Sequence, residues 1–136
     1  MVGKAELNET KWQQLAQAAK AASARAYCPY SGFPVGCAVM TGDGAIATGC
    51  NVENASFGLT SCAERNAIFR AIADGATSIV AVLLYTPTAA PVTPCGACRQ
   101  VIAEFGRDAH VRAICDGAQT LEYGLRDLLP DGFTLP

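Results

Sequence analysis

The chain has 136 residues, which suits one compact domain and leaves little room for a second. Hydrophobic residues make up 51% of it, charged residues 16%, and the formal net charge is -2. Lysine and arginine are scattered singly, so no basic run can follow a phosphate backbone, which argues against a nucleic-acid partner. The most hydrophobic stretch, at 79–84, is too short to span a bilayer, which argues against a membrane partner.

The cysteine content gives the first indication of chemistry. The first ten residues lack the apolar core of a signal peptide, so we expect a cytoplasmic protein. Seven cysteines, an odd number, then indicate free thiols or a metal site and not a disulfide framework. The low charge and the many alanines also indicate that sister subunits cover part of the surface.

The first third of the chain predicts a helix followed by a hairpin. Apolar residues at helical spacing predict a helix that is capped by Asn8 or Thr10 and runs to about Arg25. After a loop rich in proline and glycine, strands are predicted at 35–40 and 45–52. The Gly-Asp-Gly turn between them is typical of a hairpin, so the two strands should pair.

The rest of the chain alternates between predicted helices and strands. In order, these are a helix at 62–73, a strand at 79–84, a helix at 98–105, strands at 110–115 and 120–123, and a helical turn at 125–129. This alternation predicts an α/β fold in one domain over residues 1–136. We expect a three-layer αβα sandwich around a mixed sheet of about five strands.

Two short segments carry residues with metal-binding chemistry. Cys95 and Cys98 are three residues apart where a helix is predicted to begin, which places both sulfurs on one side of its first turn. Cys62 stands at the start of another predicted helix, and helix N-termini favour thiolates. If the two helices lie side by side with their N-termini together, the three sulfurs converge.

Three protein ligands are typical of a catalytic zinc site, because the fourth position stays open for water. We therefore predict one Zn²⁺ per chain, held by Cys62, Cys95 and Cys98. Glu64 would lie beside the water as a proton acceptor. Arg65 would offset the negative charge of the three thiolates.

Local patterns allow other interpretations of the same residues. Ser61 and Glu64 fit a capping box, in which Ser61 caps the helix and Glu64 reaches back to it. Cys95 and Cys98 fit the redox pair of thioredoxin-like proteins, but that reading leaves Cys62 and Glu64 unexplained.

A structural zinc site is a further alternative, and it needs a fourth protein ligand. The candidates are Cys28, Cys37, Cys50, Cys115 and His110. They lie mainly on predicted strands, where a buried cysteine behaves as a small hydrophobe, so we interpret all five as structural. A zinc-stabilised module that binds or assembles without catalysis is the non-enzyme alternative.

Five stretches of the chain together match the pattern of one enzyme family. They are Tyr30 to Gly36, Asn51 to Asn54, Cys62 to Arg65, Pro94 to Gln100, and Leu128 to Pro130 followed by Phe133. Through them the chain resembles the short, homotetrameric zinc-dependent cytidine deaminases over nearly its whole length. The resemblance implies hydrolytic deamination of cytidine and deoxycytidine to uridine and deoxyuridine with release of ammonia, in pyrimidine salvage.

The resemblance also implies how a small-molecule nucleoside is bound. Asn51 and Glu53 would hold the ribose 3′-hydroxyl and its neighbouring groups. Phe33 would pack in the nucleoside pocket, and the backbone at Ala63 would read the base edge. Phe133 would cover the pyrimidine from a neighbouring subunit, so the active sites of a homotetramer would be shared.

Two positions depart from the family pattern and bear on the substrate. Phe57 stands where relatives often carry tyrosine, and Tyr85 stands where a small or acidic residue is expected. The alternative substrates are therefore a modified cytosine nucleoside or a blasticidin-type antibiotic. Asn51 and Glu53 favour a free ribose or deoxyribose, and a polynucleotide is disfavoured because no basic groove is predicted.

Overall fold

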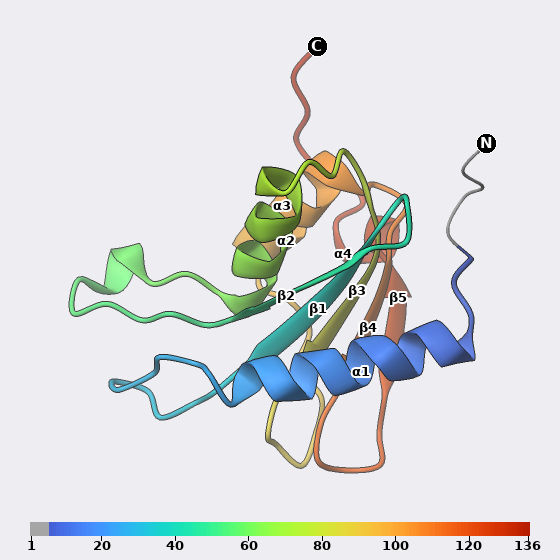
Figure 1. Cartoon of the computed structure of the whole chain (residues 1–136). Coiled ribbons are helices and arrows are strands. Elements are labelled where there is room, and N and C mark those ends of the chain that lie inside the picture. The colour runs from blue at the N-terminus through green and yellow to red at the C-terminus, as the bar shows by residue number, and fades with distance from the viewer. Residues whose placement is uncertain (1–5) are drawn as a thin grey trace.

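One mixed sheet of five strands forms the centre of the molecule (Figure 1). The computed structural model describes residues 6–136. The strands are β1 (Gly36–Thr41), β2 (Ile46–Cys50), β3 (Ile79–Tyr85), β4 (His110–Ile114) and β5 (Leu121–Gly124), in the spatial order β2-β1-β3-β4-β5. β3 and β4 are parallel, and the other neighbouring pairs are antiparallel. The beginning of β1 and the ends of β3 and β4 therefore lie at one end of the sheet.

Helices cover both faces of this sheet, which confirms the predicted three-layer α/β sandwich (Figure 1). They are α1 (Glu9–Ser23), α2 (Ala63–Ala73), α3 (Gly96–Phe105) and the short α4 (Leu125–Leu128). α1 packs on one face, and α2 and α3 pack on the other. None of the helices within residues 6–136 combines the length and apolar character needed to cross a bilayer.

The alternation of side chains along β1 shows why both faces are buried. Ala38 and Met40 point to the α1 side and pack with Leu15, whereas Cys37 and Val39 point to the α2 side. All five side chains are fully buried. Successive strand residues face opposite sides, so a strand covered on both sides is apolar throughout.

Two glycines allow the helices to lie directly against the strands. A Cβ atom on Gly36 would lie 1.9 Å from the carbonyl oxygen of Ala19 in α1. A Cβ atom on Gly49 would lie 2.4 Å from the backbone nitrogen of Ala67 in α2. Any other residue at either position would push a helix away from the sheet.

The predicted elements are all present, with differences at their ends. Asn8 is the cap of α1, because its Oδ1 accepts from the Lys11 backbone at 2.9 Å, and Thr10 lies inside the helix. The second strand stops at Cys50 and not at 52, since Val52 forms only isolated bridges beyond it. α3 begins at Gly96, two residues earlier than predicted, and a short 3-10 helix at 57–59 was not predicted.

Candidate active site

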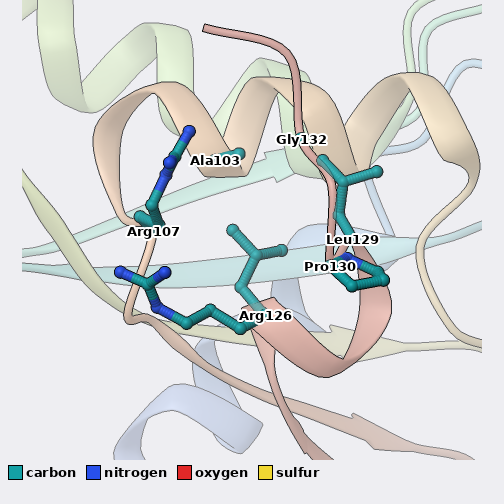
Figure 2. Close-up of a pocket in the computed structure, with 7 residues that line it drawn as sticks. Ala103, Arg107, Arg126, Leu129, Pro130 and Gly132 are labelled. Carbon is teal, nitrogen blue, oxygen red and sulfur yellow. The ribbon is translucent and has the colours of Figure 1, made fainter.

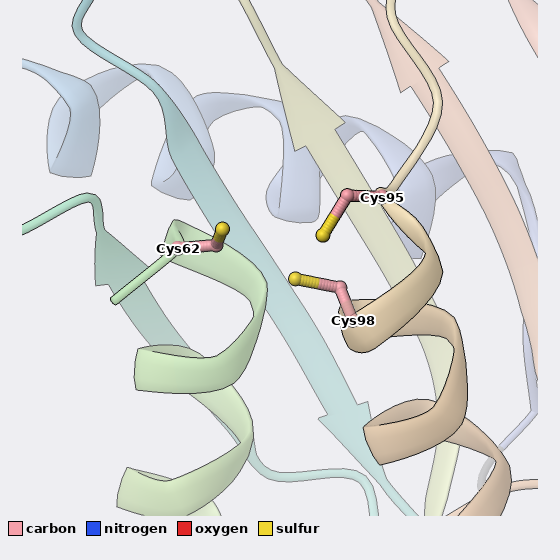
Figure 3. Close-up of side chains that lie close together, drawn as sticks. All are labelled: Cys62, Cys95 and Cys98. Atoms are coloured by element: carbon pink, nitrogen blue, oxygen red, sulfur yellow. The ribbon is translucent and has the colours of Figure 1, made fainter. Parts of the chain in front are cut away.

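Three thiols from two helices meet at one end of the α2/α3 face. Cys62 is the N-cap of α2, Cys95 is the N-cap of α3, and Cys98 lies in the first turn of α3. Their three sulfur atoms all lie within 4.8 Å of one another. Figure 3 shows the three side chains pointing toward a common centre from the two helix starts. The predicted convergence of the helix N-termini is confirmed.

This donor set fits one zinc ion. Sulfur ligands of a tetrahedral zinc, with Zn–S bonds of about 2.3 Å, lie about 3.8 Å apart. The three thiols need only small adjustments to reach that spacing. Within residues 6–136, neither His110 nor any other cysteine joins the group. That arrangement argues against a closed structural site, and the third thiol argues against a simple redox pair.

The thiol of Cys62 lies in a strongly perturbed environment. The Cys98 thiol and then the Arg65 guanidinium lower the pKa of Cys62 to about 5, although burial acts in the opposite direction. Nη2 of Arg65 donates to Sγ of Cys62 at 3.3 Å. Nε of Arg65 is buried and has no hydrogen-bond partner among the described residues. Arg65 is thus directed at the thiol group, as its predicted charge-balancing role requires.

Glu64 is a buried carboxyl next to these thiols, with only 4% of its surface exposed. Burial raises its pKa, and the nearby charge of Cys62 adds to that effect. The capping-box interpretation is wrong, because Cys62 and not Ser61 is the N-cap of α2, and the Cys62 side chain makes no capping hydrogen bond among the described residues. The Ser61 hydroxyl instead donates to Oδ1 of Asn66 at 2.8 Å. Glu64 is therefore not committed to a helix cap.

The loop that carries Phe33 is held by Asn51. Oδ1 of Asn51 accepts from the Val35 backbone at 2.8 Å, and Nδ2 donates to the Phe33 carbonyl at 2.8 Å. Phe33 is 38% exposed, whereas Asn51 is buried. By its donor and acceptor count, the Asn51 amide retains one N–H and one lone pair. The sequence could not predict these contacts, because Asn51 lies far along the chain from Phe33 and Val35.

Glu53 links the loop that follows β2 to the loop that precedes β1. Its carboxylate accepts from the backbone N–H groups of Tyr30 at 3.0 Å and Ser31 at 3.1 Å, and also from the Ser31 hydroxyl. That hydroxyl and the backbone donors hold the pKa of Glu53 below its usual value. The loops at 24–35 and 51–62 project together from one end of the sheet (Figure 1).

The other two residues implied by the family resemblance lie on α2 and in the C-terminal segment. Ala63 is fully buried in the first turn of α2, where backbone N–H groups have no partner within the helix. Phe133 is 69% exposed, and its backbone is held by the side chain of Gln100. Its aromatic ring is thus presented at the surface of this chain.

The two residues that depart from the family pattern lie in different places. Phe57 is 75% exposed and packs edge to face against Tyr30, with 5.9 Å between ring centroids. Tyr85 packs against the α1-side cluster, and its hydroxyl donates to Asp116 at 2.5 Å. Lys20 of α1 lies 5.8 Å from the centre of its ring. Tyr85 is therefore on the face of the sheet opposite the thiols.

A small pocket between α3 and α4 is separate from the thiols (Figure 2). It is lined by Ala103, Arg107, Leu125, Arg126, Leu129, Pro130 and Gly132. The pocket lies at the C-terminal half of α3, whereas Cys95 and Cys98 lie at the N-terminal end of that helix. The pocket is therefore not part of the candidate site.

Sequence reasoning missed two polar residues beside the site, Asn66 and Arg99. Both make several hydrogen bonds to the segments that precede Cys62 and Cys95. The signal that could have found them is their position, four residues after a cysteine that starts a helix.

Comparison with known proteins agrees with this geometry. The family described as "Cytidine and deoxycytidylate deaminase zinc-binding region" matches residues 9–114. A cytidine deaminase of Halalkalibacterium halodurans is 45% identical over 123 residues, covering 90% of this chain and 93% of the relative. One from Sporosarcina psychrophila is 52% identical over 93 residues, 68% of each chain.

Solved structures extend the similarity to three dimensions. The crystal structure of a cytidine deaminase from Burkholderia pseudomallei has a TM-score of 0.85 and 46% identity. The match covers 89% of this chain and 98% of that one. A cytidine deaminase from Mycobacterium tuberculosis has a TM-score of 0.79 and 40% identity, covering 91% and 98%. The chain therefore belongs to the zinc-binding cytidine and deoxycytidylate deaminase family.

Proposed function

We propose that this protein hydrolyses cytidine and deoxycytidine to uridine and deoxyuridine, with release of ammonia. The observation that carries the proposal is the convergence of Cys62, Cys95 and Cys98 beside the buried carboxyl of Glu64. The relatives that match nearly the whole chain are named cytidine deaminases, which supports the choice of base.

The three thiols would hold the zinc ion, and Arg65 would offset their charge. Zinc bound there supplies a Lewis acid that lowers the pKa of water toward neutrality. Glu64 takes a proton from the attacking water and delivers it to N3 of the base. It then delivers the second water proton to the amino group at C4. The C4–N bond breaks, C4 keeps the oxygen as a carbonyl, and the nitrogen leaves as ammonia.

The environment of Glu64 suits a residue that accepts and donates protons. An ordinary glutamate is a weak base at neutral pH, whereas burial raises the pKa of Glu64 toward the working range of a proton carrier. Glu64 follows Cys62 by two residues at the start of α2, and this short spacing keeps its carboxyl near the Cys62 thiol.

The nucleoside would be held by residues from several parts of the chain. In this proposal Asn51 and Glu53 bind the sugar. They use the side-chain donors and acceptors that are not already engaged in hydrogen bonds to the loops. Phe33 packs against the nucleoside, and the backbone at Ala63 meets the base edge. Phe133, whose ring is exposed on its own chain, covers the pyrimidine of a neighbouring subunit.

The chain acts as one domain in a homotetramer with shared active sites, in the cytoplasm and in pyrimidine salvage. Exposed aromatic and aliphatic side chains at Tyr27, Tyr30, Val52, Phe57, Leu59 and Phe69 supply apolar surface for subunit contacts. Light scattering tests the assembly, and a monomer would contradict the role given to Phe133.

The test is a direct assay of the purified, zinc-loaded protein with cytidine and with deoxycytidine. Loss of cytosine absorbance and release of ammonia are followed together, with Glu64→Ala alongside. We expect turnover by the wild type and a loss of about 10²–10⁴-fold or more in the variant, which should retain zinc and fold. Near-normal activity in Glu64→Ala would contradict its role.

The same assay separates the alternatives. One bound zinc per chain without turnover of either nucleoside would point to a modified cytosine or a blasticidin-type antibiotic as substrate. Absence of both zinc binding and turnover would return the cysteines to the redox interpretation.

A further inference from the structure

The two helices that carry the thiols begin in the same way. The residue four positions after the N-cap cysteine is Asn66 in α2, after Cys62, and Arg99 in α3, after Cys95. Its backbone N–H donates to the carbonyl of that cysteine, at 3.1 Å for Asn66 and 2.9 Å for Arg99. In both helices the side chain then turns back to the segment that precedes the cysteine.

Asn66 ties the residue before Cys62 to the end of β2. Its Nδ2 donates to the carbonyl of Cys50 at 2.7 Å and to that of Ser61 at 3.4 Å. Its Oδ1 accepts from the Ser61 hydroxyl at 2.8 Å. The amide therefore uses both of its ends, and any rotation of the side chain would break contacts on two segments.

Arg99 does the same for the loop before Cys95. Nε donates to the Pro94 carbonyl at 2.8 Å, and Nη2 donates to the Thr93 hydroxyl at 3.1 Å. Nη1 donates to the carbonyl of Leu128, at the end of α4, at 3.1 Å. The planar guanidinium group can serve three acceptors in fixed directions, which an ammonium group on a flexible stem does not do.

We propose that Asn66 and Arg99 are paired positioning residues of the metal centre. Each fixes the backbone just before a ligand cysteine, so that thiols from two separate helices stay at a common ligand distance. Hydrogen bonds that orient ligands typically change metal affinity or activity by about 10–100-fold when they are removed. The inference rests on the ligand assignment in the proposed function, and it adds the residues that hold the ligands in place.

A nearby contact offers an internal comparison on α3. Gln100, the residue after Arg99, exchanges two hydrogen bonds with the backbone of Phe133, at 2.8 and 3.2 Å. These bonds anchor the C-terminal segment and do not reach the loop before Cys95. Removing them should leave metal retention as it is.

The test measures the rate of zinc release from the loaded, full-length protein to a chromogenic chelator. The variants are Arg99→Lys, Arg99→Ala, Asn66→Ala and Ser61→Ala, with Gln100→Ala and the exposed Arg107→Ala as controls. We expect release to be about 10–100-fold faster for both Arg99 variants and for Asn66→Ala. Ser61→Ala removes one bond of the Asn66 set and should have a smaller effect. Both controls should release zinc as the wild type does.

Arg99→Lys keeps the charge and is the decisive variant, since it is expected to fold. Wild-type release from Arg99→Lys would show that charge alone matters, and it would overturn the positioning role of Arg99. A lower Tm with unchanged zinc release from the folded variants would show a merely structural role and overturn the proposal. If the wild type bound no zinc, the proposed function itself would fail, and that result is distinct from either outcome.

Discussion

Both faces of the central sheet are covered by helices, but only one of them brings together groups with metal-binding chemistry. On one face, α1 packs against the strands and buries Trp12, Leu15 and Ala19. Arg112 lies over the Trp12 ring at 4.3 Å, so even a charged group on this face serves packing. On the other face, α2 and α3 point their N-termini at a common centre (Figure 3).

The difference lies in how a helix meets the site and not in how well it is packed. A helix that contributes only its side can offer a packed surface, whereas a helix start offers free backbone N–H groups and a favourable dipole for thiolates. We therefore expect changes on the α2/α3 face to damage metal binding and turnover, and changes on the α1 face to damage stability alone.

The largest effect should follow loss of one of the three thiols at a helix start. Cys95→Ala removes one of three thiols, and metal binding and folding are linked, so the variant should lose zinc, turnover and thermal stability together. Zinc content by atomic absorption and Tm by circular dichroism check this, with Cys28→Ala as a control outside the thiol group. A Cys95→Ala protein with one zinc per chain and the wild-type Tm would refute the metal centre.

A smaller effect should follow loss of the charge that faces the thiols. Arg65→Gln removes the hydrogen bond to Cys62 and leaves the thiolate charge without an offset, so water at the site is harder to deprotonate. We expect turnover to fall by about 10–100-fold and the pH profile of kcat to move to higher pH. Exposed Arg70 on the same helix provides the control, as Arg70→Gln. An unchanged pH profile in Arg65→Gln would remove Arg65 from the site.

A change on the α1 face should have the opposite signature. Leu15→Ala leaves a cavity against Met40 and Leu83, and the free energy of unfolding should fall by about 2–5 kcal/mol. Zinc content and kcat per folded molecule should be unchanged, and the exposed Gln17→Ala on the same helix should behave as the wild type. If folded Leu15→Ala has an altered KM or zinc content, the two faces are coupled.

The smallest effect concerns the projecting loops, which belong to neither face. The pKa of Glu53 is lowered in the folded protein, so its carboxylate stabilises the fold above the unfolded pKa of about 4.3. That contribution is lost as the pH falls through the lower folded value. In Glu53→Gln, Tm should fall less steeply on acidification below pH of about 4.3 than in the wild type. Parallel Tm curves for the two proteins would contradict this assignment.

Much of the fold was open to prediction because its signals are local. The helical spacing before Arg25, the hairpin turn and the apolar run at 79–84 each depend on neighbours in the sequence, and each gave an element that the structure contains. The ends were less predictable, since they depend on contacts with distant segments. The second strand stops at Cys50, where Asn51 turns its amide to the backbone at 33 and 35.

The sequence by itself determined which residues can do the chemistry at this site. The spacing of Cys95 and Cys98, and of Cys62 and Glu64, sets them on single helix turns, because the geometry of a turn is the same in every helix. Only the tertiary structure decided that the two turns meet, that Tyr85 faces away from them, and that Arg99 reaches Leu128. These outcomes depend on where the sheet places segments that are distant in sequence, and no local spacing contains that information.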